Sequence, residues 1–485
     1  MIDLLNLKQY REGNRLEAKK AQGGLPRSLW ETYSSFANSK GGIILLGVEE
    51  LNDHSLKVCG VSSADKLLAE FWNIINNSKK VSVNLLRDKD VQVHILEDAE
   101  VISITVPRAD RRDKPVYIDN DIFRGAYRRN GDGDYHCTKS EVQYMLKDQS
   151  DIAQDMLILG DIGLDVFDMD TVAKYRLMLR QRKEKHPWVE LDNIDFLHKV
   201  GAISKSHEDG EFHPTSAGLL MFGYEYEILK EFPNFLLDYQ EKFDDKLRWT
   251  DRIVSNLGEW SGNIFDFYSK VSWKVTQDLK IPFNLVGMQR VDNSPLEEAI
   301  REALANALIH ANYYDRQGLV IQKYRDKIVI SNPGIFRIDI ESAIGGGISD
   351  PRNAQIMRMF ALVGICERVG SGLYNIFDVW EKSGLAKPMI EEKFNPDRIV
   401  LTLMTSCEVD DVDVNVDVNV DVKLSSTENQ IYQILKDEPS ATMLDIAVII
   451  GKTKKTVERA IHKFKANNLI KRIGSDKDGH WEIRK

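Results

Sequence analysis

Three polar residues stand at four-residue intervals between Leu296 and His310. Glu302, Asn306 and His310 therefore share one face of an expected helix. A carboxylate one turn before a carboxamide can hold a water beside a metal-bound phosphate, with the glutamate as base and the amide oxygen on Mg²⁺. The spacing predicts that Glu302 is catalytic and that Asn306 and His310 bind a cofactor, with Asn306 also a metal ligand. The alternative is an ordinary solvated helix face.

Two glycine-containing segments follow this stretch in order. They are Ile330–Phe336, which contains Asn332 and Gly334, and Glu367–Leu373, which contains Gly370 and Gly372. Glycine lets a phosphate approach the backbone and collect amide donors, especially where a helix begins. A helix is expected to open at Gly370 to Leu373, and Gly345–Gly347, between the two segments, could belong to a mobile lid.

The order of these motifs resembles the GHKL ATPases, the group that includes gyrase and the histidine kinases. Glu302 to His310 is similar to its N box, and the two glycine segments are similar to its glycine boxes. The resemblance implies that ATP and Mg²⁺ bind at Asn306, His310, Asn332, Gly334, Gly370 and Gly372. Asn332 replaces the Asp that accepts the adenine amino group in that family, and its amide oxygen can still accept. A structural module without nucleotide is the alternative.

The N-terminal residues carry a second resemblance. Glu12–Lys19, Phe36–Glu50, Lys114–Tyr117 and Tyr127–Arg129 resemble the Alba-like domain of the Schlafen group. In Schlafen nucleases, matching carboxylates form a metal-dependent site that cleaves RNA, which implies that Glu12, Glu17 and Glu50 are catalytic metal ligands. The alternative is that these glutamates are structural or solvated. With the other signals, the chain resembles a bacterial family of Schlafen-type transcriptional regulators with divergent ATPase modules.

A basic, aromatic segment lies within the same domain. Its cations could neutralise phosphates while Tyr117, Phe123 and Tyr127 stack on exposed bases. A solvated basic face is the alternative, because four aspartates dilute the charge. The predicted nucleic-acid-binding residues here are Arg108, Arg111, Arg112, Lys114, Arg124, Arg128 and Arg129.

The C-terminal residues read as a winged helix-turn-helix. Helices are expected from Ser426, from Met443 to Ile450 and from Lys454 to Asn467, followed by strands Leu469–Arg472 and Trp481–Arg484. Val457, Ile461 and Phe464 would face inward. The outward cations that could contact DNA are Lys454, Lys455, Arg459 and Lys463. The resemblance is to bacterial winged-helix regulators, and a protein-contact module is the alternative.

Length and composition favour an α+β multidomain protein. A chain of 485 residues is too long for one core, and no apolar run is long enough to cross a bilayer. Four scattered cysteines suggest neither zinc nor a disulfide framework and suit the cytoplasm. The predicted parts are a Schlafen/Alba-like domain (1–148), a connecting region (149–288), a GHKL-like α/β sandwich (289–405), an acidic Val/Asp linker (406–425) and the winged helix (426–485).

Together these patterns predict a nucleotide-regulated protein that binds DNA and could also bind RNA, a transcriptional regulator that binds ATP and could hydrolyse it. The alternative is a metal-dependent Schlafen-like RNase, active in phage defence, with regulatory ATPase and winged-helix modules. A homo-oligomer is expected because several GHKL proteins dimerise. No Gly-x4-Gly-Lys-Ser/Thr loop is present, so translocation is not predicted.

Overall fold

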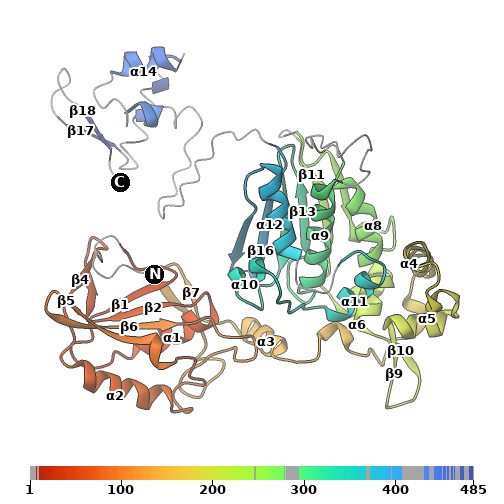
Figure 1. Ribbon diagram of the computed structural model, residues 1–485, viewed down its shortest axis with the longest axis horizontal. Coiled ribbons are helices and arrows are strands. Elements are labelled where there is room, and N and C mark those ends of the chain that lie inside the picture. The colour runs from red at the N-terminus through yellow and green to blue at the C-terminus, as the bar shows by residue number, and fades with distance from the viewer. Residues whose placement is uncertain are drawn as a thin grey trace. The chain divides into compact units, whose positions relative to one another are not determined.

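The chain divides into two compact units, Met1–Val409 and Asp410–Lys485, with the boundary inside the predicted acidic linker. The computed structural model describes residues 7, 10–244, 247–277, 279, 294–366, 372–394, 396–406, 431–435 and 442–450, and parts of 452–483. Both units mix helices and strands, so the predicted α+β multidomain class is confirmed (Figure 1).

A four-stranded sheet organises the N-terminal part, in the order β1-β2-β6-β5. The strands are β1 (Leu16–Lys19), β2 (Gly42–Leu46), β5 (Val91–Leu96) and β6 (Ala99–Val106), and only β1 and β2 pair in parallel. Apolar residues lie on both faces, where α1 (Ser28–Asn38) and α2 (Ala64–Ile75) contribute to the larger core.

Two hairpins and a helix complete this part. The hairpins are β3 (Val48–Glu50) with β4 (Leu56–Val58) and β7 (Tyr127–Asn130) with β8 (Gly133–His136). Helix α3 (Lys139–Asp148) begins with a capping box between Thr138 and Glu141. It leads away from the N-terminal sheet toward the rest of the unit (Figure 1).

Short helices and one hairpin connect α3 to the second sheet. They are α4 (Met169–Arg182), α5 (Asn193–Val200), β9 (Ile203–Lys205) with β10 (Phe212–Pro214), α6 (Ser216–Phe222) and α7 (Glu225–Glu231). Short 3₁₀ turns occur at Asp88–Asp90, Gln154–Met156, Leu164–Val166, Pro187–Glu190 and Ser255–Leu257.

The second sheet has six strands in the order β12-β11-β13-β14-β16-β15. They are β11 (Leu237–Glu241), β12 (Asp251–Val254), β13 (Leu319–Lys323), β14 (Lys327–Pro333), β15 (Met389–Lys393) and β16 (Arg398–Met404). Helices α8 (Ile264–Lys274), α9 (Pro295–His310) and α12 (Gly372–Ser383) lie together on one side of this sheet (Figure 1). The segment between β14 and α12 forms α10 (Ile340–Gly345) and α11 (Ala354–Leu362).

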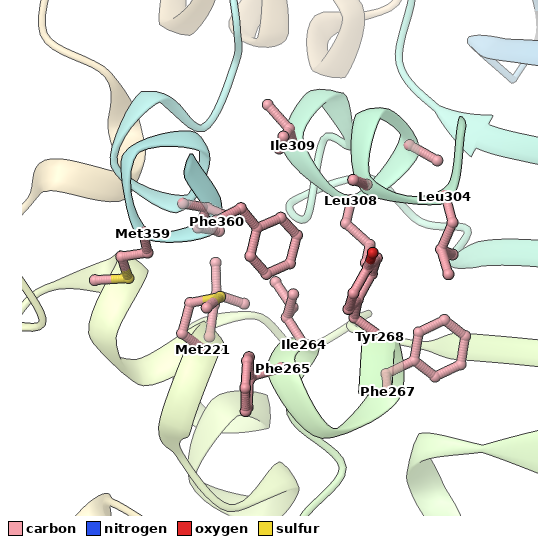
Figure 2. Packing of buried hydrophobic residues seen from close by; sticks show 14 of the residues in the cluster. Met221, Ile264, Phe265, Phe267, Tyr268, Leu304, Leu308, Ile309, Met359 and Phe360 are labelled. Atoms are coloured by element: carbon pink, nitrogen blue, oxygen red, sulfur yellow. The ribbon is translucent and has the colours of Figure 1, made fainter. Parts of the chain in front are cut away.

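This sheet corrects the predicted boundary at residue 288. β11 pairs in parallel with β13, so strands on both sides of the boundary belong to one sheet. One apolar core also runs from Val166 to Leu403, and Figure 2 shows α6, α8, α9 and α11 contributing to it. The pattern of 149–288 showed its helices but not the long-range pairing of β11.

The second unit packs Val457, Ile461 and Phe464 into a small core with Ile431 and Ile446, as their helical spacing predicted. The described residues include α14 (Met443–Ile449) and an antiparallel pair, β17 (Ile470–Ile473) with β18 (His480–Ile483). The two expected strands are therefore present within one residue of their predicted bounds. Their assignment as the wing of a winged helix stays a prediction.

Candidate functional site

Helix α9 carries the three residues with which the sequence analysis began. Ser294 accepts a hydrogen bond from the Glu297 amide and caps the helix, and Pro295 occupies its first turn. At the other end, Nδ2 of Asn353 donates to the carbonyls of Ile309 and Ala311 at 2.9 and 2.8 Å. These contacts fix the C-terminus of α9 beside the segment after α10.

An open cleft lies between α9, α12 and the ends of β14, β15 and β16. It contains about 940 Å³ of empty space, including the open solvent at its mouth. Aliphatic side chains such as Ile330, Ile376 and Leu401 form much of its wall. The polar lining residues are Asn306, His310, Asn332, Arg337, Ser349, Asp350 and Arg352. We call this space the α9 cleft.

One end of the α9 cleft lies at the start of α12. A Cβ atom added at Gly372 would lie 2.5 Å from Nδ2 of Asn306 and 2.9 Å from Oε1 of Glu302. Gly372 therefore allows the start of α12 to lie directly against both α9 side chains. The first turn of this helix offers amide N–H groups to an anion. Glu302 itself lies beside Gly372 but does not line the cleft.

Asn332 is the second polar feature of the cleft. The residue is 5% exposed and lies on β14, whose alternate residues face inward. Its Oδ1 atom is buried and accepts no hydrogen bond from any residue that the structure describes. An unpaired buried acceptor costs free energy, so a ligand that donates to this oxygen gains an unusually favourable contact.

Arg337 and Arg352 give the α9 cleft positive charge. His310 lies beside them, and burial together with these two cations lowers its pKa to about 4. The imidazole is therefore neutral at neutral pH and contributes a neutral donor or acceptor. Gly334, by contrast, does not line the α9 cleft, and Gly370 lies outside the described residues.

The basic segment 108–129 does not form the predicted free surface. Arg108 pairs with Glu392, Arg111 with Asp350, and Arg128 with Asp397 and Glu141. Arg129 pairs with Glu17 and Asp134, and buried Lys114 donates to the Asn38 carbonyl at 3.1 Å. These five cations are corrected from phosphate ligands to internal contacts. Arg124 is exposed, and exposed Arg112 lies 3.2 Å from Asp151.

The predicted three-carboxylate metal site is also corrected. Glu17 is held by Lys19 at 2.8 Å and by Arg129 at 2.6 Å, while Glu50 contacts His54 at 3.0 Å. Burial, with smaller contributions from Glu17 and Glu50, raises the pKa of Glu12 to about 7. Among the described residues, no three His, Cys, Asp or Glu side chains are placed to hold one metal ion.

In the second unit, Lys454 is exposed, as its outward position predicted. The side chains of Lys455, Arg459 and Lys463 lie outside the described residues. Their role as DNA contacts stays a prediction.

Sequence reasoning missed the charged residues that join the two sheets of the first unit. Asp148, at the end of α3, accepts hydrogen bonds from Arg337 at 2.8 Å and Arg352 at 2.9 Å. Both arginines also line the α9 cleft. The proximity of Asp350 and Arg352 to the expected lid glycines could have pointed to a ligand role. Nothing in the sequence links Asp148 to them.

The geometry defines a mixed α+β multidomain chain with a polar cleft, and family models match three of its segments. Residues 10–138 match the Schlafen AlbA_2 family, and residues 317–403 match the family described as putative ATP-dependent DNA helicase recG C-terminal. Residues 143–238 match a domain of unknown function. The recG match includes Asn332 and Gly372 but begins after α9, so Asn306 lies outside it.

Similarity to solved structures is distant. The DIP2311 protein from Corynebacterium diphtheriae is 17% identical over 97% of this chain and 92% of its own, with a TM-score of 0.41. The N-terminal domain of a putative ATP-dependent DNA helicase RecG-related protein from Nitrosomonas europaea is 27% identical over 28% of this chain and 95% of its own, with a TM-score of 0.23. No curated protein matches the chain. None of the described helices is long and apolar enough to cross a membrane.

Proposed function

We propose that this chain is a nucleotide-regulated nucleic-acid-binding protein that binds ATP in the α9 cleft and acts in transcription regulation. The observation that carries the nucleotide assignment is the buried Oδ1 of Asn332, which has no partner among the described residues and lies in a cleft whose wall is largely aliphatic. The 6-amino group of adenine is a donor on a flat apolar ring, which suits such a wall. The recG C-terminal family match over residues 317–403 supports the same assignment.

The phosphates belong, on this proposal, at the start of α12. Amide N–H groups of that helix, together with Arg337, would bind them, and the Asn306 amide oxygen would hold Mg²⁺. The metal would neutralise phosphate charge and orient the terminal phosphate. The carboxylate and carboxamide that meet at Gly372 are a suitable donor set for this task. Glu302 would act as the base if hydrolysis occurs.

The proposed regulation depends on the contacts that the two cleft arginines make outside the cleft. Arg337 and Arg352 line the α9 cleft and also bond to Asp148, the last residue of α3. A phosphate that attracts either arginine competes with Asp148, so nucleotide would favour a different arrangement of the N-terminal part. Such a shift requires different nucleotide affinities in the two arrangements, which this competition supplies.

The nucleic-acid ligand is DNA, with RNA as a further candidate, on the strength of the Schlafen AlbA_2 match and the basic composition of residues 426–485. Lys454, Lys455, Arg459 and Lys463 would contact phosphates there, with Arg112 and Arg124 as the exposed cations of the basic segment. Because each phosphate contact releases counterions, removing one of these cations should reduce the slope of log affinity against log salt by about 1.

Calorimetric titration of Mg²⁺-ATP into the wild type and into Asn306→Ala tests the proposal. Saturable binding to the wild type, weakened roughly tenfold in the variant, is expected for the loss of one metal-supporting oxygen. Asn193→Ala, a change of the same type far along the chain on α5, should leave affinity unchanged. No binding of ATP, ADP or GTP by the wild type would make the α9 cleft structural.

A further inference from the structure

A second cavity lies where the N-terminal part meets the segment after β14. It contains about 530 Å³ of empty space, including open solvent at its mouth, and shares Ile335, Phe336, Arg337 and Arg352 with the α9 cleft. Six cationic side chains line it, against the three carboxylates Asp148, Asp315 and Asp397. We call this space the arginine cavity. Its cations are Arg108, Arg111, Lys114, Arg128, Arg337 and Arg352.

The carboxylates around the arginine cavity leave part of this charge without a partner. Glu392, Asp350 and Asp397 each take one of Arg108, Arg111 and Arg128, and Glu141 also contacts Arg128. Arg337 and Arg352 share the carboxylate of Asp148, and Arg337 also lies 3.7 Å from Asp350. Lys114 is 6% exposed and has no ion-pair partner among the described residues. Lys114 is therefore the cation of this lining that no described carboxylate pairs with, while Arg352 depends on a carboxylate that it shares.

Several donors of these cations also have no acceptor. Nε of Arg128, Nε of Arg337, and both Nε and Nη1 of Arg352 are buried without a hydrogen-bond partner in the described structure. Arg352 is 5% exposed. A Cβ atom at Gly334 would lie 2.6 Å from its free Nη1. Gly334 lines the arginine cavity and not the α9 cleft, so this donor faces the second space.

We propose that the arginine cavity is a second ligand site, which binds a phosphate-class oxyanion. Planar guanidinium groups with free N–H donors match the oxygens of phosphate, and buried lysine adds a point charge. Burial lowers the pKa of Lys114, and the neighbouring Arg108 and Arg128 lower it further. A bound oxyanion would oppose that effect and accept hydrogen bonds from the free donors. The site does not depend on nucleotide binding in the α9 cleft.

Inorganic pyrophosphate is the probe for this site, titrated calorimetrically into the full chain without divalent metal at constant ionic strength. Wild-type protein should bind it saturably. Lys114→Met, which changes a residue outside the α9 cleft, should weaken binding roughly tenfold or more. Lys66→Met removes the same charge from an exposed position on α2 and should change affinity less than about twofold.

An unfolding measurement and a second variant distinguish a loss of binding from a loss of folding. Lys114→Met removes a buried cation beside two others but also the hydrogen bond to the Asn38 carbonyl, so thermal unfolding without pyrophosphate must show that the variant is folded. Arg108→Lys keeps a charge beside Glu392 while removing the planar fork, and it should weaken binding about threefold or more. Wild-type affinity in a folded form of either variant would overturn the proposal.

Asn306→Ala distinguishes the two cavities. If the oxyanion binds in the arginine cavity, this change in the α9 cleft leaves pyrophosphate affinity within about twofold of wild type. Loss of pyrophosphate binding in Asn306→Ala, with retention in Lys114→Met, would place the anion in the α9 cleft and contradict the second site. Failure of ATP binding alone would contradict the proposed function and leave this inference standing.

Discussion

The α9 cleft and the basic segment 108–129 both carry many chemically capable residues, but the fold uses them differently. In the cleft, Asn306 and Asn332 face an open space, and one of their oxygens has no partner. In the basic segment, Arg108, Arg111 and Arg128 turn toward carboxylates more than 100 residues later in the chain. Clustered charge in a sequence therefore indicates a ligand site only where the fold leaves the charge without an internal partner.

The largest expected effect tests the internal role of the basic segment. Arg128→Met should lower the free energy of unfolding by about 3–5 kcal/mol, because it leaves Asp397 and Glu141 without their shared, buried partner. Urea unfolding measures the change. Arg124→Met, at an exposed position four residues earlier, should cost less than about 0.5 kcal/mol.

The opposite pattern would break the comparison. If Arg128→Met leaves unfolding unchanged and instead reduces nucleic-acid affinity, Arg128 is a phosphate ligand and not an internal contact.

A smaller effect is expected at Gly372. In Gly372→Ala the added methyl would push on Asn306 and Glu302, whose side-chain ends can move aside. Stability should change by less than about 1 kcal/mol, because no backbone must shift. ATP affinity should fall roughly tenfold, because the moved amide is the predicted metal ligand. Gly384→Ala, just after α12 in open space, controls for added bulk near this helix, although its positive φ of 70° adds backbone strain.

If Gly372→Ala kept wild-type ATP affinity, the start of α12 would not take part in nucleotide binding. Binding would then depend on the Asn332 end of the α9 cleft alone.

The smallest effect concerns Glu12. Its pKa is raised from 4.5 to about 7, so the folded state holds a proton that the unfolded chain has released over this interval. The free energy of unfolding contributed by Glu12 is therefore greatest below pH 4.5 and falls as the pH rises to about 7. Glu12→Gln should remove this fall and stabilise the protein at pH 8 by about 1 kcal/mol, since the side chain is only partly buried.

Denaturant unfolding between pH 5 and pH 8 measures this effect. Glu70→Gln, exposed on α2, should keep the wild-type pH dependence. A Glu12→Gln profile parallel to wild type would mean that Glu12 is already ionised at pH 5, as a metal-ligand role would require.

Local pattern predicted much of the fold. The strand pair of Ile470–Ile473 with His480–Ile483 and the spacing of Val457, Ile461 and Phe464 follow from periodicity that neighbouring residues contain. The pairing of β11 with β13 did not, because the partners are about 80 residues apart and their register depends on the assembled core.

The candidate site was likewise predicted in part, where short motifs marked its residues. Asn306 and Gly372 were predicted from short motifs, and they meet in the structure. The ion pairs of Arg108 and Arg128 with Glu392 and Asp397 were not predicted, since isolated acidic residues carry no motif. The predicted homo-oligomer and cytoplasmic location stay predictions, and light scattering with and without nucleotide would test the former.

The most direct test of the account compares ATP with inosine triphosphate in wild type and in Asn332→Leu. Inosine carries an oxygen where adenine has its amino group, so its 6-position cannot donate to Oδ1 of Asn332. Wild-type protein should prefer ATP by about 5- to 150-fold, equivalent to roughly 1–3 kcal/mol, and the variant should lose that preference. Equal affinities in the wild type, or an unchanged preference in Asn332→Leu, would contradict adenine recognition in the α9 cleft.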